Sequence, residues 1–196
     1  WERSCMAKVK SGKYWVAWAK THAKNSTSLA DLETSFQNKV TKFKQALEAA
    51  GATVNIDATR RSKKRAYLFH WCWKLSQGKC KAKDIPAMIG VDIDWNHGTE
   101  DASISAAKEM VTGFGLAMPP RSTNPPALTS NHIAGEAVDM TIIWSGKITV
   151  AKKDGAKVEV TFMPNVNANL VLHEAGRSYG VIKLKTDAPH WSYNGR

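Results

Sequence analysis

The chain lacks both a long apolar run and the cysteines of a disulfide-stapled or thiolate-bound domain. No segment approaches the ~20 consecutive apolar residues that a membrane-spanning helix requires. The three cysteines, Cys5, Cys72 and Cys80, are too few for a disulfide framework, although one bridge between Cys72 and Cys80 is possible. No two cysteines are spaced as CxxC, so a zinc site built from thiolate pairs is excluded.

No secretory signal is visible in this sequence, because Trp1–Lys20 mixes lysines with apolar residues throughout. Hydrophobic residues nevertheless make up 43% of the 196 residues, which is enough to form a core. The chain contains no internal repeat and no low-complexity tract. We therefore expect one globular domain over residues 31–196, preceded by an N-terminal extension over residues 1–30, and a monomeric protein.

Acidic residues are scarce in the N-terminal part of the chain. The net charge is +11, but residues 1–83 hold 18 Lys and Arg against 5 Asp and Glu, whereas residues 84–196 hold 10 against 12. Such a basic surface concentrates anionic polymers near the protein. Nucleic acid, anionic lipid and bacterial wall polymers all qualify, as does a lysine surface that is merely solvated. Since no nucleic-acid-binding motif is present, we expect no nucleic acid partner.

Hydrophobic periodicity predicts helices and strands in alternation. Apolar residues recur at intervals of three and four over Asp31–Ala50, which predicts an amphipathic helix. Alternation over Thr53–Ala58 predicts a half-buried strand, and the apolar run Ala137–Trp144 predicts a strand buried on both faces. Further helices are expected at 62–75, 101–114 and 167–176, loops at 78–98 and 119–131, a hairpin at 147–162 and a strand near 181–184. Without a regular βαβ order, this mixture predicts an α+β fold.

Asp139 is the first polar residue that needs an explanation. It interrupts the apolar run Ala137–Trp144, where a carboxylate is costly unless a partner compensates its charge. A cation is a natural compensator, and Gly135 lets the chain turn so that His132 can approach the same ion. The alternative is that Asp139 meets an arginine or backbone amides.

Asp187 and His190 form a second pair of candidate site residues. Pro189 argues against a regular strand and for a turn, which can bring both side chains to one side. Two imidazoles and one carboxylate, from His132, His190 and Asp139, leave one tetrahedral position of zinc open, as in catalytic sites. Asp187 can then take a proton from the attacking water and pass it to a leaving amine. Alternatively, His190 is a tail histidine in an ordinary hydrogen bond.

These residues also carry a resemblance to a known family. The segment Ser130-x-His132-x-x-Gly135-x-Ala137-x-Asp139, followed by Asp187-x-x-His190-Trp191, resembles the signature of the zinc D-Ala-D-Ala carboxypeptidase and L-alanyl-D-glutamate endopeptidase superfamily. The resemblance implies one zinc ion on the two histidines and Asp139, with Asp187 as the general base. It also implies that residues 31–196 form a zinc peptidase domain with a small central antiparallel sheet flanked by helices.

The same resemblance points to residues that would contact the substrate. Val54–Ser62 resembles the family's strand that ends in an arginine facing the active site, and Arg61 aligns best because a serine follows it. Arg60 is the alternative. An arginine fork suits a carboxylate or a developing oxyanion, although a surface arginine in a basic cluster explains the residue equally. Ser130, beside the ligand motif, and Trp191, as a wall of the cleft, complete the expected substrate-binding set.

Two further groups of polar residues are not expected to bind metal. Asp92, Asp94 and His97 lie close together but follow no EF-hand order, so we expect them to order a loop. His173-Glu174 resembles half of a zincin helix but lacks the second histidine, so we expect a pair on a helix surface.

The resemblance implies a function at the bacterial cell wall. Family members of the phage lysin type hydrolyse amide bonds in peptidoglycan stem peptides, and we expect cleavage between L-alanine and D-glutamate. A D,D-carboxypeptidase or D,D-endopeptidase is the alternative within this class. A wall- or nucleic-acid-binding domain, or a relative that keeps zinc without hydrolysis, is the alternative outside it. Such an enzyme would be made in the host bacterial cytoplasm and act on peptidoglycan in the periplasm, with its basic N-terminal half holding anionic envelope polymers.

Overall fold

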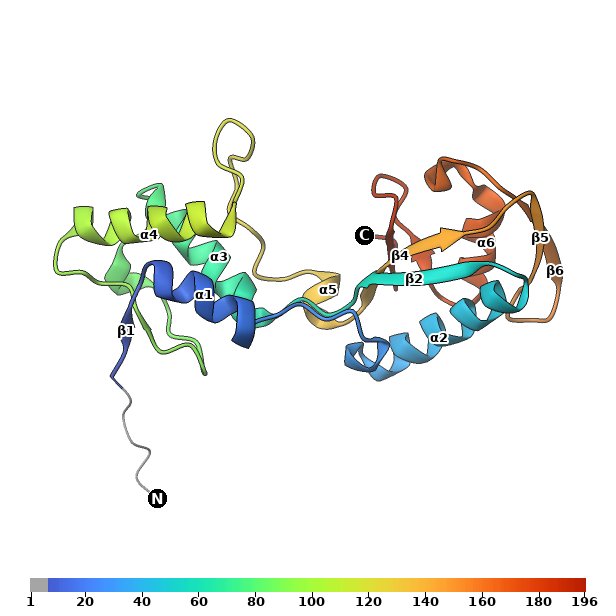
Figure 1. The fold of residues 1–196 in the computed structure, drawn as a ribbon, viewed down its shortest axis with the longest axis horizontal. Helices are drawn as coiled ribbons and strands as arrows, with labels where there is room; N and C mark the ends of the chain where they lie inside the picture. Colours follow the sequence, from blue (N-terminus) through green and yellow to red (C-terminus); the bar gives the residue numbers. More distant parts are fainter. Residues whose placement is uncertain (1–6) are drawn as a thin grey trace, which may run out of the picture. The chain divides into compact units, whose positions relative to one another are not determined.

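The computed structural model describes residues 7–196 and combines helices with short strands, which confirms the expected α+β class. The chain forms two compact units (Figure 1). The helical unit combines the described part of Trp1–Lys24 with Ser62–Leu128. The sheet unit combines Asn25–Arg61 with Thr129–Arg196. Each unit is therefore built from two stretches that are far apart in the sequence.

Three helices form the body of the helical unit, namely α1 (Lys13–His22), α3 (Lys63–Ser76) and α4 (Glu100–Phe114). The side chains of Ser62 and Thr99 cap α3 and α4, because each hydroxyl accepts a hydrogen bond from a backbone N–H in the first turn. These caps explain why the two helices begin where their apolar periodicity begins.

Aromatic side chains dominate the core of the helical unit. Trp15, Trp73 and Trp95 are each at most 4% exposed and belong to one buried cluster. A short parallel pair, β1 (Val9–Lys10) with β3 (Ile93–Asp94), lies beside the helices, and a 3-10 turn lies at Ala82–Asp84. Burying such large apolar groups is the main source of stability for this unit.

The sheet unit contains a four-stranded antiparallel sheet in the order β2-β4-β8-β7 (Figure 1). Its strands are β2 (Thr53–Ala58), β4 (Ala137–Ile143), β8 (His190–Ser192) and β7 (Ile182–Lys183). A separate hairpin consists of β5 (Lys147–Ala151) and β6 (Lys157–Thr161). The helical segments are the 3-10 turns Leu29–Asp31 and Val166–Ala168 and the helices α2 (Thr34–Ala49), α5 (Asn131–Ala134) and α6 (Leu170–Ser178).

The core of the sheet unit lies between the sheet and the helices α2 and α6. Apolar residues of α2 recur at helical spacing and are at most 2% exposed: Phe36, Val40, Phe43 and Leu47. They belong to one cluster with Val138 of β4, Leu172 of α6 and Trp191 of β8. Val138 and Trp191 are register partners across β4 and β8. Since side chains alternate between the faces of a strand, the next residues along, Asp139 and His190, point to the opposite face.

The unit boundaries differ from the expected extension at 1–30 and single domain at 31–196. Trp15 and Ala19 of α1 are buried in the core of the helical unit, so residues 7–24 are an integral part of that unit. The stretch Ser62–Leu128, expected in the single domain, also belongs to the helical unit and not to the sheet unit. Sequence periodicity could not show this, because a helix looks the same whichever core it packs against.

Elements set by local periodicity match their predictions closely, with β2, α3, α4 and the hairpin within two residues of the expected bounds. The predicted long helix begins only at Thr34, after the 3-10 turn at Leu29–Asp31. The prediction that β4 is buried on both faces is wrong for its second half. Thr141 and Ile143 are exposed, because they lie on the face opposite to the buried Met140 and Ile142.

The described cysteines form no bridge, because Cys72 and Cys80 are both free thiols. Cys72 is buried, and burial raises the pKa of its thiol well above the usual value. Cys5 lies outside the described residues. None of the helices in the described part of the chain is long and apolar enough to cross a membrane.

Candidate metal centre

His132 is presented by α5, a single helical turn directly before β4. The hydroxyl of Ser130 accepts a hydrogen bond from the backbone N–H of Ile133 at 3.2 Å and so caps this turn. The turn ends at Gly135, whose φ is 81°. A Cβ atom at this position would lie 2.9 Å from the backbone nitrogen of Glu33, so the expected role of Gly135 as a turning point is confirmed.

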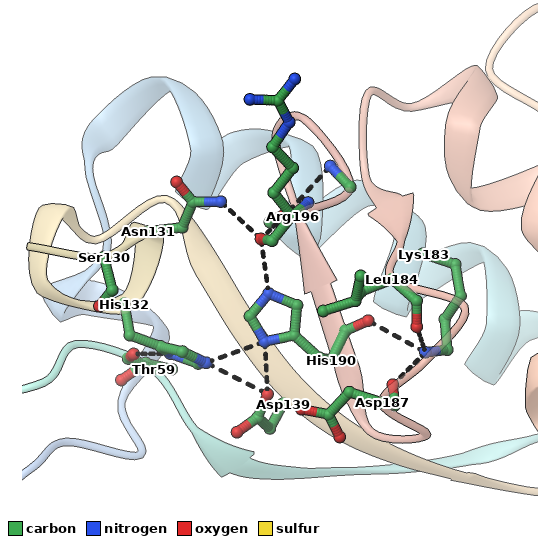
Figure 2. A network of polar contacts seen from close by, with 12 residues as sticks. Thr59, Ser130, Asn131, His132, Asp139, Lys183, Leu184, Asp187, His190 and Arg196 are labelled. Atoms are coloured by element: carbon green, nitrogen blue, oxygen red, sulfur yellow. Dashed lines mark hydrogen bonds and ion pairs between the residues drawn. The ribbon is translucent and has the colours of Figure 1, made fainter. Parts of the chain in front are cut away.

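Asp139 and His190 face each other across two neighbouring strands. They are register partners of β4 and β8, and the Oδ1 atom of Asp139 lies 3.1 Å from Nδ1 of His190. Nε2 of His132 lies 3.2 Å from the same Oδ1 atom and 3.1 Å from Nδ1 of His190 (Figure 2). The structure thus brings the three predicted ligands together at one point.

The outer nitrogen of each histidine ring is held by a backbone carbonyl. Nδ1 of His132 donates to the carbonyl oxygen of Thr59 at 2.6 Å, and Nε2 of His190 donates to the main-chain oxygen of Arg196 at 3.0 Å (Figure 2). These bonds select the tautomer and the orientation of each ring. The lone pairs of Nε2 in His132 and of Nδ1 in His190 are consequently directed toward each other and toward the carboxylate.

Three acceptor atoms that converge in this way require a cation or a proton between them. Edges of 3.1–3.2 Å are close to those of a tetrahedron of ligands around zinc, about 3.3–3.4 Å for zinc–ligand distances of about 2.0–2.1 Å. Within residues 7–196, this is the single group of three His, Cys, Asp or Glu side chains close enough to hold a metal ion. Two imidazoles and a carboxylate suit zinc by their chemistry.

The triad is buried on one side and open on the other. His132 and His190 are each 7% exposed, whereas the side chain of Asp139 is 25% exposed. A site with three protein ligands and one side open to solvent leaves room for a water molecule and a substrate group. This is the arrangement of catalytic rather than structural zinc sites.

The electrostatics of the triad favour a bound cation. Burial acts to raise the pKa of Asp139, but hydrogen bonds from His132 and His190 outweigh it and hold the pKa of this carboxyl well below its usual range. Burial acts to lower the pKa of His132, but the hydrogen bonds to Asp139 and to the Thr59 carbonyl raise it overall. A proton on His132 therefore compensates the carboxylate when no metal ion is bound.

Asp187 lies in the turn between β7 and β8. The backbone N–H of His190 donates to the Asp187 carbonyl at 3.1 Å, which closes a tight turn containing Pro189 and confirms the turn predicted there. Figure 2 shows the Asp187 side chain below the His190 ring, pointing toward Asp139. The residue is exposed, so its carboxylate is open to solvent.

The two candidate arginines at the end of β2 have different surroundings. Arg60 donates from Nη2 to the carbonyl of Ala134 at 2.8 Å and lies against Gly135, so it holds the turn after α5. Arg61 is exposed, its backbone N–H donates to the carbonyl of His132 at 3.0 Å, and its charge acts to lower the pKa of that histidine. Arg61 is therefore the exposed arginine of the pair whose charge acts on the triad, and its contact with a substrate stays a prediction.

The structure gives Ser130 and Trp191 other roles than substrate contact. Ser130 uses its hydroxyl to cap α5, and its contact with a substrate stays a prediction. The prediction that Trp191 lines the cleft is wrong, because its side chain is fully buried and packs against Phe43, with ring centroids 5.4 Å apart. The alternation of β8 sends His190 and Trp191 to opposite faces of the sheet, so the tryptophan positions the strand from behind.

The two groups of polar residues that were not expected to bind metal can also be located in the structure. Asp94 pairs with Lys10 and accepts a hydrogen bond from the backbone N–H of Asn96 at 3.0 Å, in agreement with a loop-ordering role. The prediction that His173 and Glu174 form a surface pair is wrong for the histidine. His173 is only 5% exposed and donates to the carbonyl of Val166 at 2.8 Å, since α6 turns that side toward the core.

Three contributors to the site were missed by sequence reasoning. Thr59 and Arg196 act through main-chain oxygens, which leave no signal in a sequence. Lys183 is buried on β7 and donates to carbonyls of the turn that carries Asp187. Burial lowers the pKa of Lys183 to about 8, which leaves the side chain protonated at neutral pH. A lysine inside an otherwise apolar strand was the available signal.

Comparison with known proteins does not assign the chain to a family. No protein-family model matches the chain, and a search of curated proteins finds no match. Function must therefore be argued from the geometry of the triad and its surroundings, together with the motif resemblance.

Proposed function

We propose that the chain is a zinc-dependent peptidase that hydrolyses an amide bond in the stem peptide of bacterial peptidoglycan. The observation that carries this proposal is the convergence of three candidate ligand atoms, one each from His132, Asp139 and His190, next to the Asp187 turn. The outer ring nitrogen of each histidine donates to a main-chain oxygen. We further propose the bond between L-alanine and D-glutamate, on the motif resemblance to phage lysin-type endopeptidases. The same resemblance suggests synthesis in the host cytoplasm and action in the periplasm.

The division of labour among the residues follows from their positions. Zinc held by His132, Asp139 and His190 would lower the pKa of a water molecule to about 7 and polarise the scissile carbonyl. Asp187, an exposed carboxylate beside the triad, would take the proton of the attacking water and deliver it to the nitrogen of the leaving amine. The carbonyls of Thr59 and Arg196 would hold both imidazoles in place while this happens.

Arg61 would bind the negatively charged part of the substrate. Its guanidinium is exposed next to His132, where it can donate two parallel hydrogen bonds to a carboxylate or to a developing oxyanion. A stem peptide carries free carboxylates on either side of several of its amide bonds, so this residue suits an endopeptidase and a carboxypeptidase alike. A D,D-carboxypeptidase or D,D-endopeptidase is the second candidate within the class.

The helical unit would hold the enzyme against the anionic envelope. Over residues 7–24 and 62–128 it contains 14 Lys and Arg against 6 Asp and Glu, and a groove of about 610 Å³ lies between α1 and α4. Its lining combines small and apolar residues, among them Val16 and Gly113, with the lysines Lys13, Lys20 and Lys108 and one acidic residue, Glu109. Such a groove suits a polymer in which carboxylates alternate with small apolar groups.

Digestion of purified Gram-negative peptidoglycan tests the proposal. The protein is loaded with zinc, and fragments released with and without a chelator are identified by mass spectrometry. We expect chelator-sensitive release of stem peptides, restored by added zinc, and the new fragment ends identify the bond. No release by a protein that contains zinc would refute the peptidase and favour a non-catalytic binding domain, as the basic helical unit would then suggest.

A further inference from the structure

Lys183 is a buried lysine at the base of the turn that carries Asp187. The residue is 4% exposed, and its Nζ atom donates to the carbonyls of Leu184 at 2.6 Å, of Asp187, and of His190 at 3.1 Å (Figure 2). Its three N–H donors thus match three backbone acceptors. Burying an ammonium group is costly, so its presence in the strand indicates a specific role.

The turn depends on this lysine for its shape. Its backbone hydrogen bonds link Leu184 to His190 at 3.1 Å, Asp187 to Leu184 at 3.3 Å and His190 to Asp187 at 3.1 Å. The carbonyls of these three residues also converge on Nζ of Lys183. Each carbonyl also accepts one backbone N–H of the turn, so without the lysine it would keep that partner and lose the charged donor that draws the three carbonyls together. The turn would then be held less tightly.

The third metal ligand does not depend on the turn to the same extent. His190 is paired with Asp139 across β4 and β8, and its ring is held by the main-chain oxygen of Arg196 at 3.0 Å. Asp187, by contrast, is exposed and is placed by the backbone of the turn alone. Loss of the lysine would therefore displace the carboxylate more than the imidazole.

We propose that Lys183 is a positioning residue, which holds the Asp187 carboxylate at the correct place beside the triad through the three carbonyls. The proposal rests on the proposed function, in which Asp187 is the general base. A misplacement of about 1 Å can cost about 100-fold in rate even when the displaced group is retained. Lys183 would thus act on the rate of the reaction and not on metal binding.

The test compares Lys183→Met with Lys185→Met in the zinc-loaded full chain. Lys185 lies in the same turn but is exposed, so its variant controls for the loss of one lysine. For Lys183→Met we expect a fall of about 100-fold in kcat, with KM and zinc content unchanged. Hydrogen exchange at residues 184–190 should become faster only in this variant. In an Asp187→Ala background, Lys183→Met should change kcat less than twofold further.

A folded, zinc-loaded Lys183→Met variant with the kcat of the wild type would overturn the proposal, as would a full additional rate loss in the Asp187→Ala background. If the methionine variant does not fold, Lys183→Gln is measured with the same expectations, because its shorter, neutral amide has only two N–H groups and cannot serve the three carbonyls. Failure of the proposed function is distinguishable, because the wild type itself would then cleave no peptidoglycan. Unchanged exchange at residues 184–190 in the variant would in that case still refute the positioning role.

Discussion

The helical unit and the sheet unit divide the charge and the chemistry of this chain between them. Over residues 7–24 and 62–128, the helical unit has a net charge of +8, from 14 basic and 6 acidic residues. The sheet unit has one of +3, from 13 basic and 10 acidic residues. The candidate metal-binding triad, its main-chain supports and the Asp187 turn all belong to the sheet unit. The net positive charge of the chain therefore comes mainly from the helical unit, whereas the candidate reaction centre lies in the sheet unit.

The comparison also shows two ways of building a small core. Buried tryptophans from α1, from α3 and from the segment directly after β3 fill the core of the helical unit. In the sheet unit, an aliphatic and aromatic stripe on α2 packs against the sheet. Only the sheet gives alternating faces, with Val138 and Trp191 directed into the core and Asp139 and His190 directed outward. Register across paired strands is what places two ligands side by side, and a bundle of helices offers no such pairing.

The largest effect is expected from His132→Ala, which removes a ligand from the sheet unit. We expect loss of bound zinc and of all measurable hydrolysis, together with a lower melting temperature, because metal binding and folding are linked. Metal analysis and calorimetry measure this. The control is His22→Ala in the helical unit, an exposed histidine whose loss should change neither quantity. A His132→Ala protein that is fully loaded with zinc would show that the ligand set is wrong.

The next largest effect is expected from Asp187→Ala. This residue is not a ligand, so zinc content should stay at one ion per chain while kcat falls about 10²- to 10⁴-fold, the usual contribution of a general base. Glu174→Gln, which removes an exposed carboxylate from the same unit, serves as the control and should retain full activity. Undiminished hydrolysis by Asp187→Ala would rule out the assigned base.

The third prediction concerns how pH changes the stability of the metal-free protein and its affinity for zinc. The pKa of His132 is raised above 6.5, so its contribution to stability is present below pH 6.5 and is lost as the pH rises through the folded-state pKa. The pKa of Asp139 is lowered below 3.8, so its contribution is present above pH 3.8 and is lost in acid.

The contributions of His132 and Asp139 to the stability of the metal-free protein are therefore both present between pH 3.8 and 6.5. Zinc competes with the proton on His132, so zinc affinity should rise up to about tenfold per pH unit until the histidine is deprotonated. Calorimetric titration with zinc between pH 5 and 8, in parallel with thermal melts, measures both trends. Zinc affinity that is independent of pH in this range would contradict the triad as the binding site.

The smallest effect is expected from charge reversal in the groove of the helical unit. Changing Lys13, Lys20 and Lys108 to Glu should weaken pelleting with insoluble peptidoglycan several-fold and reduce its dependence on salt, since surface charges act through screened attraction. The kcat on a soluble muropeptide should not change. The control is the same reversal at Lys42, Lys153 and Lys157, exposed lysines of the sheet unit. An equal loss of peptidoglycan binding in both triple variants would show that the net charge of the protein, and not the groove, determines this binding.

Much of the secondary structure was predictable because it follows from local periodicity. The stripe on α2, the alternation in β2 and the turn at Pro189 each depend on residues that are close in the sequence. The ligand set was predictable for a different reason. A carboxylate at Asp139 inside an apolar run is costly, and the spacing of His132 from it across a glycine turn suggested a shared ion.

Other features required contacts between distant parts of the chain. The burial of Trp191 depends on which face of β8 meets α2, and the division into two units depends on which core receives α1. The supports of the triad are carbonyls of Thr59 and Arg196, and every residue type carries a carbonyl. Sequence alone thus identified the three residues that could hold a metal ion. Tertiary structure decided how they are oriented, since strand register and backbone hydrogen bonds are set by packing between distant segments.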